Sequence, residues 1–212
     1  MSRRGLFITF EGMDGCGKTT QMHRLAARLR ATGREVIETA EPGGTRVGDQ
    51  IRRILLDARN QDLRPMAELL LYFASRAQNV EELIQPAVAG GAIVLSDRFT
   101  DSSTVYQGCG RGLGMEAVLE LERIACRGVK PDLTILIDID VETALARARA
   151  RNTAQTSGQT RMDEQSLEFY HKVYEGYHAL AAREAGRYRI IEGRADMDAI
   201  ESAVWRVVAP HV

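Results

Sequence analysis

The chain has 212 residues, of which 44% are hydrophobic and 27% are charged, and its formal net charge is −1. This composition is typical of a globular protein with one sizeable core, and the near-zero charge argues against a general binder of nucleic acid or of anionic membranes. We therefore expect a single domain over residues 1–212, with no nucleic acid and no membrane among its partners.

Three cysteines, Cys16, Cys109 and Cys126, show neither paired spacing nor metal-ligand spacing. Residues 1–4 lead directly to the first predicted strand without the apolar run of a signal peptide, and no other run is long enough to cross a membrane. These features favour a cytoplasmic protein with reduced thiols.

The first two predicted elements enclose a glycine-rich loop. Apolar residues 6–10 predict a buried strand, and residues 20–31 predict a helix. The loop between them follows the phosphate-binding pattern of Gly, four residues and Gly-Lys-Thr. It consists of Gly12, Met13, Asp14, Gly15, Cys16, Gly17, Lys18 and Thr19.

The residue types of this loop suit a nucleoside triphosphate. Glycines allow the backbone to wrap the phosphates and to direct its N–H groups at them. Lys18 would reach the β- and γ-phosphates, and Thr19 would offer its hydroxyl to Mg²⁺. The helix that begins near Thr20 would add the positive end of its dipole. The loop thus predicts a site for the phosphates of a nucleoside triphosphate, with magnesium as the cofactor.

Two further helices follow a second strand. Residues 36–40 predict that strand, and the run Glu-Pro-Gly-Gly-Thr at 41–45 predicts a turn at its carboxyl end. Residues 46–56 predict a helix, and Pro65 opens a longer one, which Pro86 and the glycines at 90–91 are expected to close. The buried faces of the two helices are expected to carry Val47, Ile51, Ile54 and Leu55, and then Met66, Leu69, Leu70, Phe73 and Ala77.

Strands and helices continue to alternate through the second half. Residues 92–97 and 133–138 predict buried strands, and residues 188–191 predict a last strand. Helices are expected at 115–125, 141–151, 164–184 and 198–208, a glycine-rich stretch at 106–112, and a mobile polar loop at 152–160. The aromatic stripe of the helix at 164–184 is expected to lie in the core.

This alternation predicts an α/β fold. Strands separated by helices form a parallel sheet, here of about five strands, with helices on both faces, and the phosphate loop makes it similar to the P-loop NTPases. Ligands of such sheets bind at the carboxyl ends of the strands. Candidate site residues are therefore sought there.

Two strand ends carry charged side chains. Asp97 ends one apolar strand and is expected to help hold Mg²⁺, and Asp138, at the end of another, is the competing candidate. Arg98 follows Asp97 and is expected to make bidentate contact with a second phosphate; the alternative is a role as a partner for Asp97, and both roles could hold. Arg76, on the long helix, could reach the same place or be a solvated surface residue.

Several motifs taken together resemble the bacterial thymidylate kinase family. Besides the phosphate loop they are Glu-Pro-Gly-Gly-Thr at 41–45, Asp-Arg-Phe at 97–99, Ser-Ser at 102–103 and Tyr-Gln-Gly at 106–108. The resemblance covers residues 6 to about 192. It implies transfer of the γ-phosphoryl group of ATP to dTMP, giving ADP and dTDP for dTTP synthesis, and a homodimer.

The same resemblance implies an acceptor site. Asp14 would contact the sugar 3′-hydroxyl, or else only cap its own loop, and Tyr106 would lie where a ribose 2′-hydroxyl would go, or else only pack a helix end. Either Tyr72 or Phe73 would stack on the base. The residues implied for dTMP are Asp14, Glu41, Pro42, Tyr72, Phe73, Arg76, Arg98, Ser102, Ser103, Tyr106 and Gln107.

A lid over about 148–163 is expected to supply a catalytic arginine, because the variable positions of the phosphate loop contain none. Such a cation stabilises charge on the transferring group. Arg147, Arg149 and Arg151 precede the polar loop and Arg161 follows it. Arg151 is the first candidate and Arg161 the second, while Arg147 is expected against the adenine. The alternative is that these arginines form a solvated charged surface without a catalytic role. With these, the catalytic set is Lys18, Arg98, Asp14, Arg151 and Arg161.

Three other classes share the phosphate loop. A deoxynucleoside kinase uses the same donor but an acceptor without phosphate, which Arg98 and Arg76 argue against. A GTP-binding regulatory protein would carry Asn-Lys-x-Asp, which does not occur in the chain. A partitioning ATPase would carry an extra lysine early in the loop, where this chain has Met13.

Overall fold

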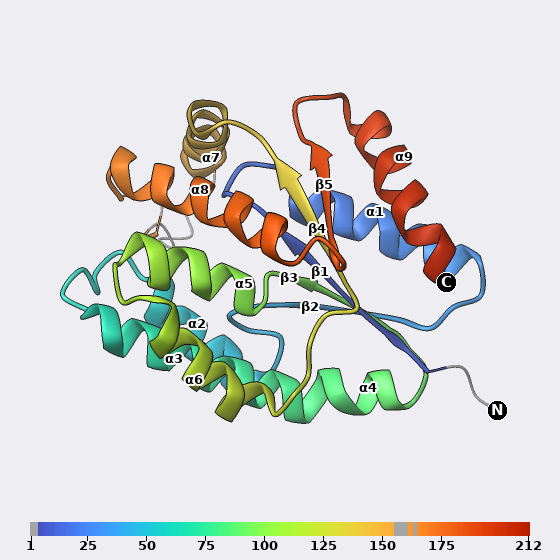
Figure 1. Cartoon of the computed structure of the whole chain (residues 1–212), viewed down its shortest axis with the longest axis horizontal. Helices are drawn as coiled ribbons and strands as arrows, with labels where there is room; N and C mark the ends of the chain where they lie inside the picture. Colours follow the sequence, from blue (N-terminus) through green and yellow to red (C-terminus); the bar gives the residue numbers. More distant parts are fainter. Residues whose placement is uncertain (1–3, 155–160, 163–164) are drawn as a thin grey trace.

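The computed structural model describes residues 4–154, 161–162 and 165–212. Within them, five parallel strands form one sheet in the order β2-β3-β1-β4-β5 (Figure 1). The strands are β1 (Leu6–Glu11), β2 (Val36–Ala40), β3 (Ile93–Asp97), β4 (Leu133–Asp138) and β5 (Tyr188–Glu192). The predicted α/β class, the strand count and the parallel sheet are confirmed.

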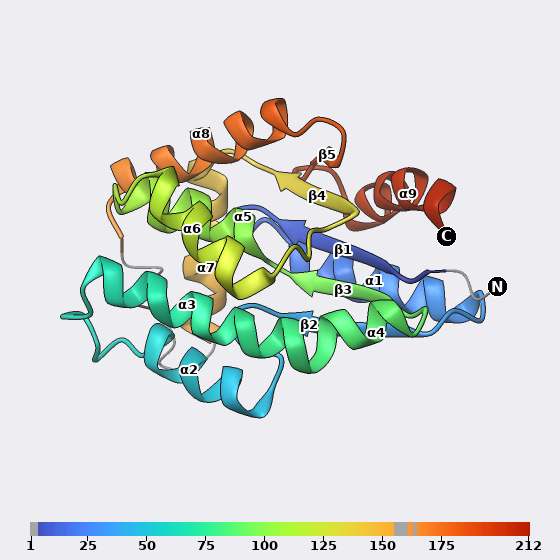
Figure 2. The ribbon, with the colours of Figure 1, turned by 60° about the horizontal axis from the view of Figure 1, so that its bottom comes forward.

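Helices cover both faces of the sheet (Figures 1 and 2). On one face lie α1 (Lys18–Ala31), α7 (Val141–Ala154), α8 (Leu167–Arg183) and α9 (Met197–Val208). On the other lie α3 (Pro65–Asn79), α4 (Gln85–Ala89) and α6 (Met115–Cys126), and α2 (Arg46–Leu56) packs on α3. The short α5 (Thr100–Ser103) follows β3.

The two faces explain why the strands are apolar throughout. Phe7 pairs with Val94 and Ile8 with Leu95 across β1 and β3. Successive side chains of a strand point to opposite faces, so Phe7 and Val94 join the core under α3 and α6, whereas Ile8 and Leu95 join the core under α1 and α9. Because both faces are buried, no polar alternation remains.

The topology places the phosphate loop in a crevice. β1 lies between β3 and β4. After β1 the chain builds the sheet on one side with β2 and β3, and then on the other side with β4 and β5. Ligands of such sheets bind at this switch point. Gly15 in this loop has φ of 84°, and a Cβ there would lie 2.3 Å from the backbone oxygen of Ala144 in α7. Only glycine permits this close approach.

The long helix from Pro65 does not end at Pro86. A π-helical turn, Val80–Ile84, joins α3 to α4, so the helical run passes through Pro86 and ends at Ala89, directly before the glycines at 90–91. Part of the predicted apolar stripe is also wrong. Met66, Leu70 and Ile54 are 44%, 49% and 47% exposed, because α2 and α3 pack on each other, and α3 on the sheet, through other positions.

The glycine-rich stretch after Tyr106 is helical. Residues Thr104–Gly110 form π-helical turns directly after α5, with Tyr106 and Gln107 buried. A Cβ at Gly110 would lie 2.5 Å from the ring of Phe169 in α8. The glycine there serves helix packing.

The expected polar loop at 152–160 falls partly on α7, which extends to Ala154, and its remainder, 155–160, lies outside the described residues. The next helix begins at Leu167, three residues later than expected, because Ser166 caps it by accepting from the Phe169 N–H at 3.2 Å. The aromatic stripe of α8 is buried as expected, including Tyr170 and Tyr177.

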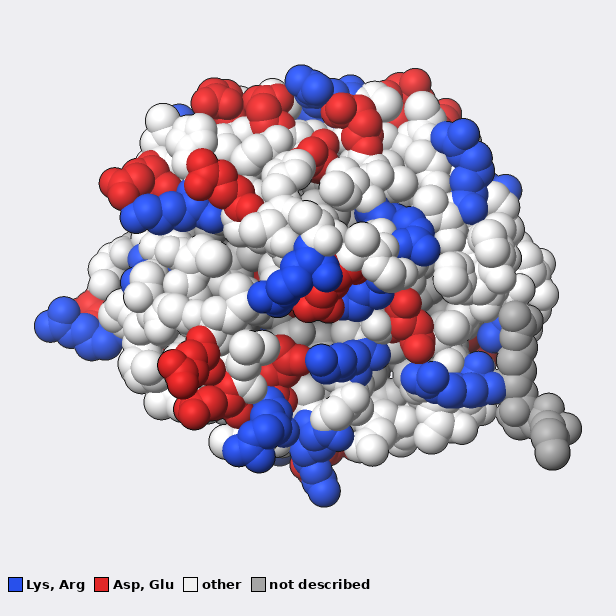
Figure 3. All heavy atoms as spheres, in the orientation of Figure 1, with Lys and Arg blue, Asp and Glu red and all other residues white. Residues whose placement is uncertain are grey.

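The surface is charged but mixed. On the face in Figure 3, Lys and Arg alternate with Asp and Glu without a broad area of one sign. Every helix among the described residues is too short or too polar to span a bilayer.

Candidate active site

A cavity of about 290 Å³ opens at the carboxyl ends of β1, β2 and β3. Most of the predicted site residues line it, and they come from the phosphate loop, the segments after β2 and β3, α3 and α7. They are Asp14, Lys18, Thr19, Glu41, Pro42, Tyr72, Arg76, Asp97, Arg98, Ser102, Ser103, Tyr106, Gln107 and Arg151. Arg52, Leu56 and Met162 also line it and were not predicted.

The phosphate loop contributes mainly backbone and one cation. Met13 and Cys16 are buried, so they offer main-chain groups, and the three cysteines of the chain are free thiols. Lys18 Nζ lies 3.5 Å from the Met13 carbonyl oxygen, while Thr20 is exposed on the first turn of α1. Gly12 and Gly17 have φ of 134° and 95°, in the range that favours glycine.

The two predicted magnesium ligands meet. The hydroxyl of Thr19 donates to the carboxylate of Asp97. The competing Asp138 instead lies 3.2 Å from His178. No group of three or more His, Cys, Asp or Glu side chains in the described ranges is arranged as a metal site. One carboxylate and one hydroxyl suit Mg²⁺, which usually keeps several waters and shares substrate phosphates.

Asp14 links the two cations of the site. Arg98 Nη2 donates to Asp14 Oδ1 at 3.0 Å, and Lys18 Nζ lies 3.5 Å from the same oxygen. Burial raises the pKa of Asp14, but the charges of Arg98 and Lys18 outweigh it and hold that pKa well below its usual range. Asp14 is therefore ionised at neutral pH.

Arg98 is fixed by its backbone and by three hydroxyls. Its φ of 72° lies in the left-handed region, which is rare for a residue with a side chain. Its guanidinium donates to Ser102 Oγ at 2.9 Å, to the Tyr177 hydroxyl at 3.0 Å and to the Tyr106 hydroxyl at 3.3 Å. The ion pair of Arg98 is with Asp14, so the alternative of a simple Asp97 partner does not describe it.

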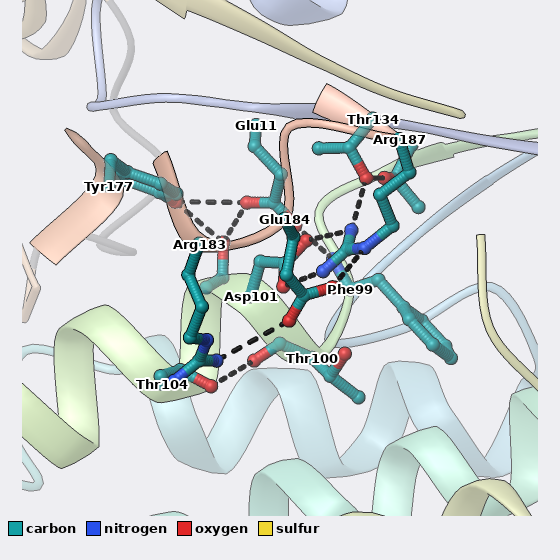
Figure 4. A network of polar contacts seen from close by, with 12 residues as sticks. Glu11, Phe99, Thr100, Asp101, Thr104, Thr134, Tyr177, Arg183, Glu184 and Arg187 are labelled. Atoms are coloured by element: carbon teal, nitrogen blue, oxygen red, sulfur yellow. Dashed lines mark hydrogen bonds and ion pairs between the residues drawn. The ribbon is translucent and has the colours of Figure 1, made fainter. Parts of the chain in front are cut away.

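Glu11, which was not predicted as a site residue, stabilises the segment from Arg98 to Ser102. Its carboxylate accepts from Phe99 N at 2.7 Å, Ser102 Oγ at 2.6 Å and the Tyr177 hydroxyl at 2.9 Å (Figure 4). Burial, reinforced by the charge of Asp101, raises the pKa of Glu11 to about 7. The sequence held one signal, a charged residue ending an apolar strand directly before the phosphate loop.

A second set of contacts, made by Arg187, stabilises α5. Arg187 donates to both carboxylate oxygens of Asp101 at 2.7 Å, and also to Glu184 and Thr134 (Figure 4). A bidentate pair of this kind fixes geometry as well as charge. The segment that carries Arg98 and Ser102 is thus tied to β1 and to the start of β5.

The aromatic candidates are separated by the fold. Tyr72 lines the cavity, whereas Phe73 is buried in the core behind it, with the Arg76 guanidinium 4.7 Å from its ring centroid. Tyr106 is 5% exposed, and its hydroxyl lies 3.4 Å from Asp14 Oδ2. Its ring therefore belongs to the site, although its edge also packs on Phe169.

Arg76 is almost completely buried, and its guanidinium donates to protein groups. Its Nε donates to Glu41 at 2.5 Å, and its other nitrogens donate to Ser103 Oγ and the Phe99 carbonyl, both at 3.0 Å. Burial raises the pKa of Glu41 despite this ion pair. Arg76 is 1% exposed, so the solvated-surface alternative is wrong.

The two lid candidates lie in different surroundings. Arg151 lines the cavity, and its charge helps to lower the pKa of Asp14. Arg161 is 2% exposed and pairs with Glu68 at 2.7 Å, outside the cavity lining. Arg147, whose Nη1 donates to the Gly193 carbonyl at 3.1 Å, lies where α7 meets the chain after β5.

Comparisons with known proteins agree with this geometry. The thymidylate kinase family model matches residues 10–204. The chain is 50% identical to the thymidylate kinase of Geobacter sulfurreducens over 209 residues, 98% of each chain, and 47% identical to that of Solidesulfovibrio magneticus over 205 residues, 96% and 98% of the two chains.

A solved structure shares the fold. It is that of thymidylate kinase from Ehrlichia chaffeensis, which is 32% identical, covers 97% of this chain and 99% of its own, and superposes with a TM-score of 0.79. The family model and these relatives match nearly the whole chain, and the phosphate loop and the sheet agree with them. The chain belongs to the thymidylate kinase family.

Proposed function

We propose that the cavity is where this chain transfers the γ-phosphoryl group of ATP to dTMP, giving ADP and dTDP. The observation that carries the proposal is the position of Asp14, which contacts Lys18 on the donor side and Arg98 on the acceptor side. Two phosphates that must meet in line need cations on both, and this pair of contacts supports that arrangement.

On the donor side, the phosphate loop and Lys18 bind the β- and γ-phosphates. Thr19 and Asp97 would hold Mg²⁺, a fit supported by their mutual contact and by the preference of that ion for oxygen ligands. Bound there, the ion would neutralise charge on the phosphates. Arg147 would lie against the adenine, where its contact with Gly193 brings it beside the chain after β5.

On the acceptor side, Arg98 binds the monophosphate and Asp14 the sugar 3′-hydroxyl. Arg52, on α2, is a further cation of the cavity wall; its Nη1 donates to the Pro42 carbonyl at 2.7 Å. Tyr72 stacks on the base. Arg76, Ser103 and Gln107 form the polar end of the cavity, supported by the hydrogen bond from Arg76 to Ser103.

A coupled assay of ADP release with ATP, Mg²⁺ and each nucleoside monophosphate in turn tests this proposal. Turnover should be highest with dTMP and should need Mg²⁺, and thymidine should be inert because it lacks the acceptor phosphate that Arg98 would bind. Equal or better use of CMP, UMP or AMP would contradict the dTMP assignment. Turnover of thymidine would instead indicate a deoxynucleoside kinase.

Tyr106 should set the preference for a deoxyribose. If its ring occupies the 2′ face, Tyr106→Ala should narrow the ratio of kcat/KM for dTMP over the ribose analogue by about tenfold, the usual worth of one steric contact in a pocket. Tyr106→Phe keeps the ring and should keep the ratio. An unchanged ratio in Tyr106→Ala would assign the ring to packing against Phe169.

We propose further that residues 1–212 form one domain with a lid over about 148–163, in a cytoplasmic homodimer. The three free thiols support the compartment. The helices α3 and α6 lie side by side (Figure 2). They support the dimer, because both expose large apolar side chains. These are Met66, Leu70, Leu119 and Ile124, which are 44%, 49%, 47% and 62% exposed.

Leu70→Glu should raise the dimer dissociation constant by about tenfold or more, because association would bury an unpaired charge. Sedimentation velocity over a concentration series measures the change. Ile190→Glu is the matched control, since Ile190 is equally exposed but lies on β5. A wild-type chain that is monomeric throughout the series, or an equal effect of the two variants, would contradict this interface.

A further inference from the structure

Glu68, on α3, lies outside the cavity lining but carries an unusual set of hydrogen bonds. It is fully buried, and its Oε1 accepts from Gln107 Nε2 at 2.8 Å and Arg111 Nε at 3.2 Å. Its Oε2 accepts from Arg111 Nη2 at 3.1 Å and pairs with Arg161 Nη1 at 2.7 Å. Both oxygens are thus saturated with donors.

This environment keeps Glu68 ionised. Burial raises its pKa, but the hydrogen bonds from Arg111 and Gln107, with the charges of Arg111 and Arg161, outweigh burial and leave the pKa below its usual value. An ionised carboxylate only accepts hydrogen bonds. The group of Gln107 that faces Glu68 must therefore be the amide NH₂.

The amide of Gln107 then has only one orientation. With its nitrogen on Glu68, its carbonyl oxygen is the atom left for other contacts. Gln107 is 1% exposed and lines the cavity. A hydrogen-bond acceptor is thus fixed at the polar end of the cavity.

We propose that Glu68 is a positioning residue for base specificity: by fixing the amide of Gln107, it presents the carbonyl oxygen to the base and selects pyrimidines that carry a proton on N3. The inference rests on the proposed dTMP site. Thymine and uracil have an N3–H donor, whereas N3 of cytosine is an acceptor and would face the oxygen unpaired. A buried polar group left unpaired strongly disfavours the wrong ligand.

Glu68→Gln tests the inference because it is nearly isosteric. The new side-chain oxygen should turn to the two arginines, and its NH₂ should turn to Gln107. The Gln107 amide would then reverse and present its NH₂ to the base. The ratio of kcat/KM for dTMP over dCMP should fall by about tenfold or more.

Two ratios separate this effect from general damage. The dTMP-to-dUMP ratio should stay the same, because both bases carry N3–H and differ only in a methyl group. Arg111→Met is the matched control: it removes contacts of Glu68 but keeps the bond to Gln107, so its dTMP-to-dCMP ratio should match wild type. If Glu68→Gln alone does not fold, Glu68→Gln/Arg111→Met, which removes one charge of each sign, is compared with Arg111→Met.

An unchanged dTMP-to-dCMP ratio in a folded Glu68 variant would overturn the inference. So would an equal fall in Arg111→Met, because Glu68 would then act only through packing. Both outcomes differ from failure of the proposed function, which would appear as a wild-type chain that does not phosphorylate dTMP.

Discussion

Arg151→Ala is expected to lower kcat by about 10³-fold or more, with little change in the affinity for ATP or dTMP. An arginine that stabilises charge on the transferring phosphoryl group acts in the transition state and contributes on the order of 10³–10⁵ in rate. Arg151 lines the cavity, and its charge acts on Asp14 of the phosphate loop. Steady-state turnover, with nucleotide affinities measured by calorimetry, provides the test.

Arg149→Ala is the matched control. Arg149 lies on the same exposed helix end but is absent from the lining of the cavity. Its loss should leave kcat within a fewfold of wild type. Near-wild-type turnover of Arg151→Ala would refute the lid-arginine mechanism for this residue.

Arg161→Ala should behave differently from Arg151→Ala. Its guanidinium is buried on Glu68 and on the Leu55 carbonyl, at 2.5 Å. Breaking a buried ion pair costs about 3–5 kcal/mol, so the variant should lose stability in a thermal melt. A stable Arg161→Ala with turnover lowered about 10³-fold would exchange the roles of the two arginines.

The phosphate-binding core of the site could be predicted from the sequence. The loop pattern fixes Lys18 and Thr19 by local chemistry, and Asp97 and Arg98 follow an apolar strand whose carboxyl end must lie beside the loop in a parallel sheet. The structure brings these side chains to one cavity. Sequence spacing was sufficient because each residue sits within a few positions of a strand end.

The supporting residues could not be predicted, because their roles come from contacts across the fold. Tyr177 was expected in the core of α8, and it is buried there, yet its hydroxyl reaches Arg98 and Glu11. Glu68 fits the pattern of a surface helix residue, but Arg111 and Arg161, which lie far from it in the sequence, pair with its carboxylate and bury it. Helical periodicity reports which face is apolar and cannot report these charged partners.

Arg98→Ala is expected to cost about 2–5 kcal/mol of transition-state stabilisation with dTMP, measured as a fall in kcat/KM. This is the cost of removing one partner from a desolvated, hydrogen-bonded charge pair. That is about 30-fold to several thousand-fold. The affinity for ATP alone should barely change, because Lys18 and the loop backbone remain. Equal loss of ATP affinity would assign Arg98 to the donor side or to structure.

Alanine is the informative substitution at this position. Arg98 has φ of 72°, and alanine keeps the Cβ and hence the same backbone strain, whereas glycine would relieve that strain and change stability as well. The turn should survive, because Glu11 still accepts from Phe99 N and Ser102. The variant therefore removes the guanidinium and little else.

Tyr177→Phe separates the guanidinium from its support. It removes the hydroxyl that Arg98 and Glu11 share, but it leaves Arg98 paired with Asp14 at 3.0 Å. Its effect on dTMP use should be near the net worth of one hydrogen bond, about 1 kcal/mol. If Tyr177→Phe were as damaging as Arg98→Ala, the hydroxyl network would be the dominant element, and direct contact of Arg98 with the acceptor phosphate would be contradicted.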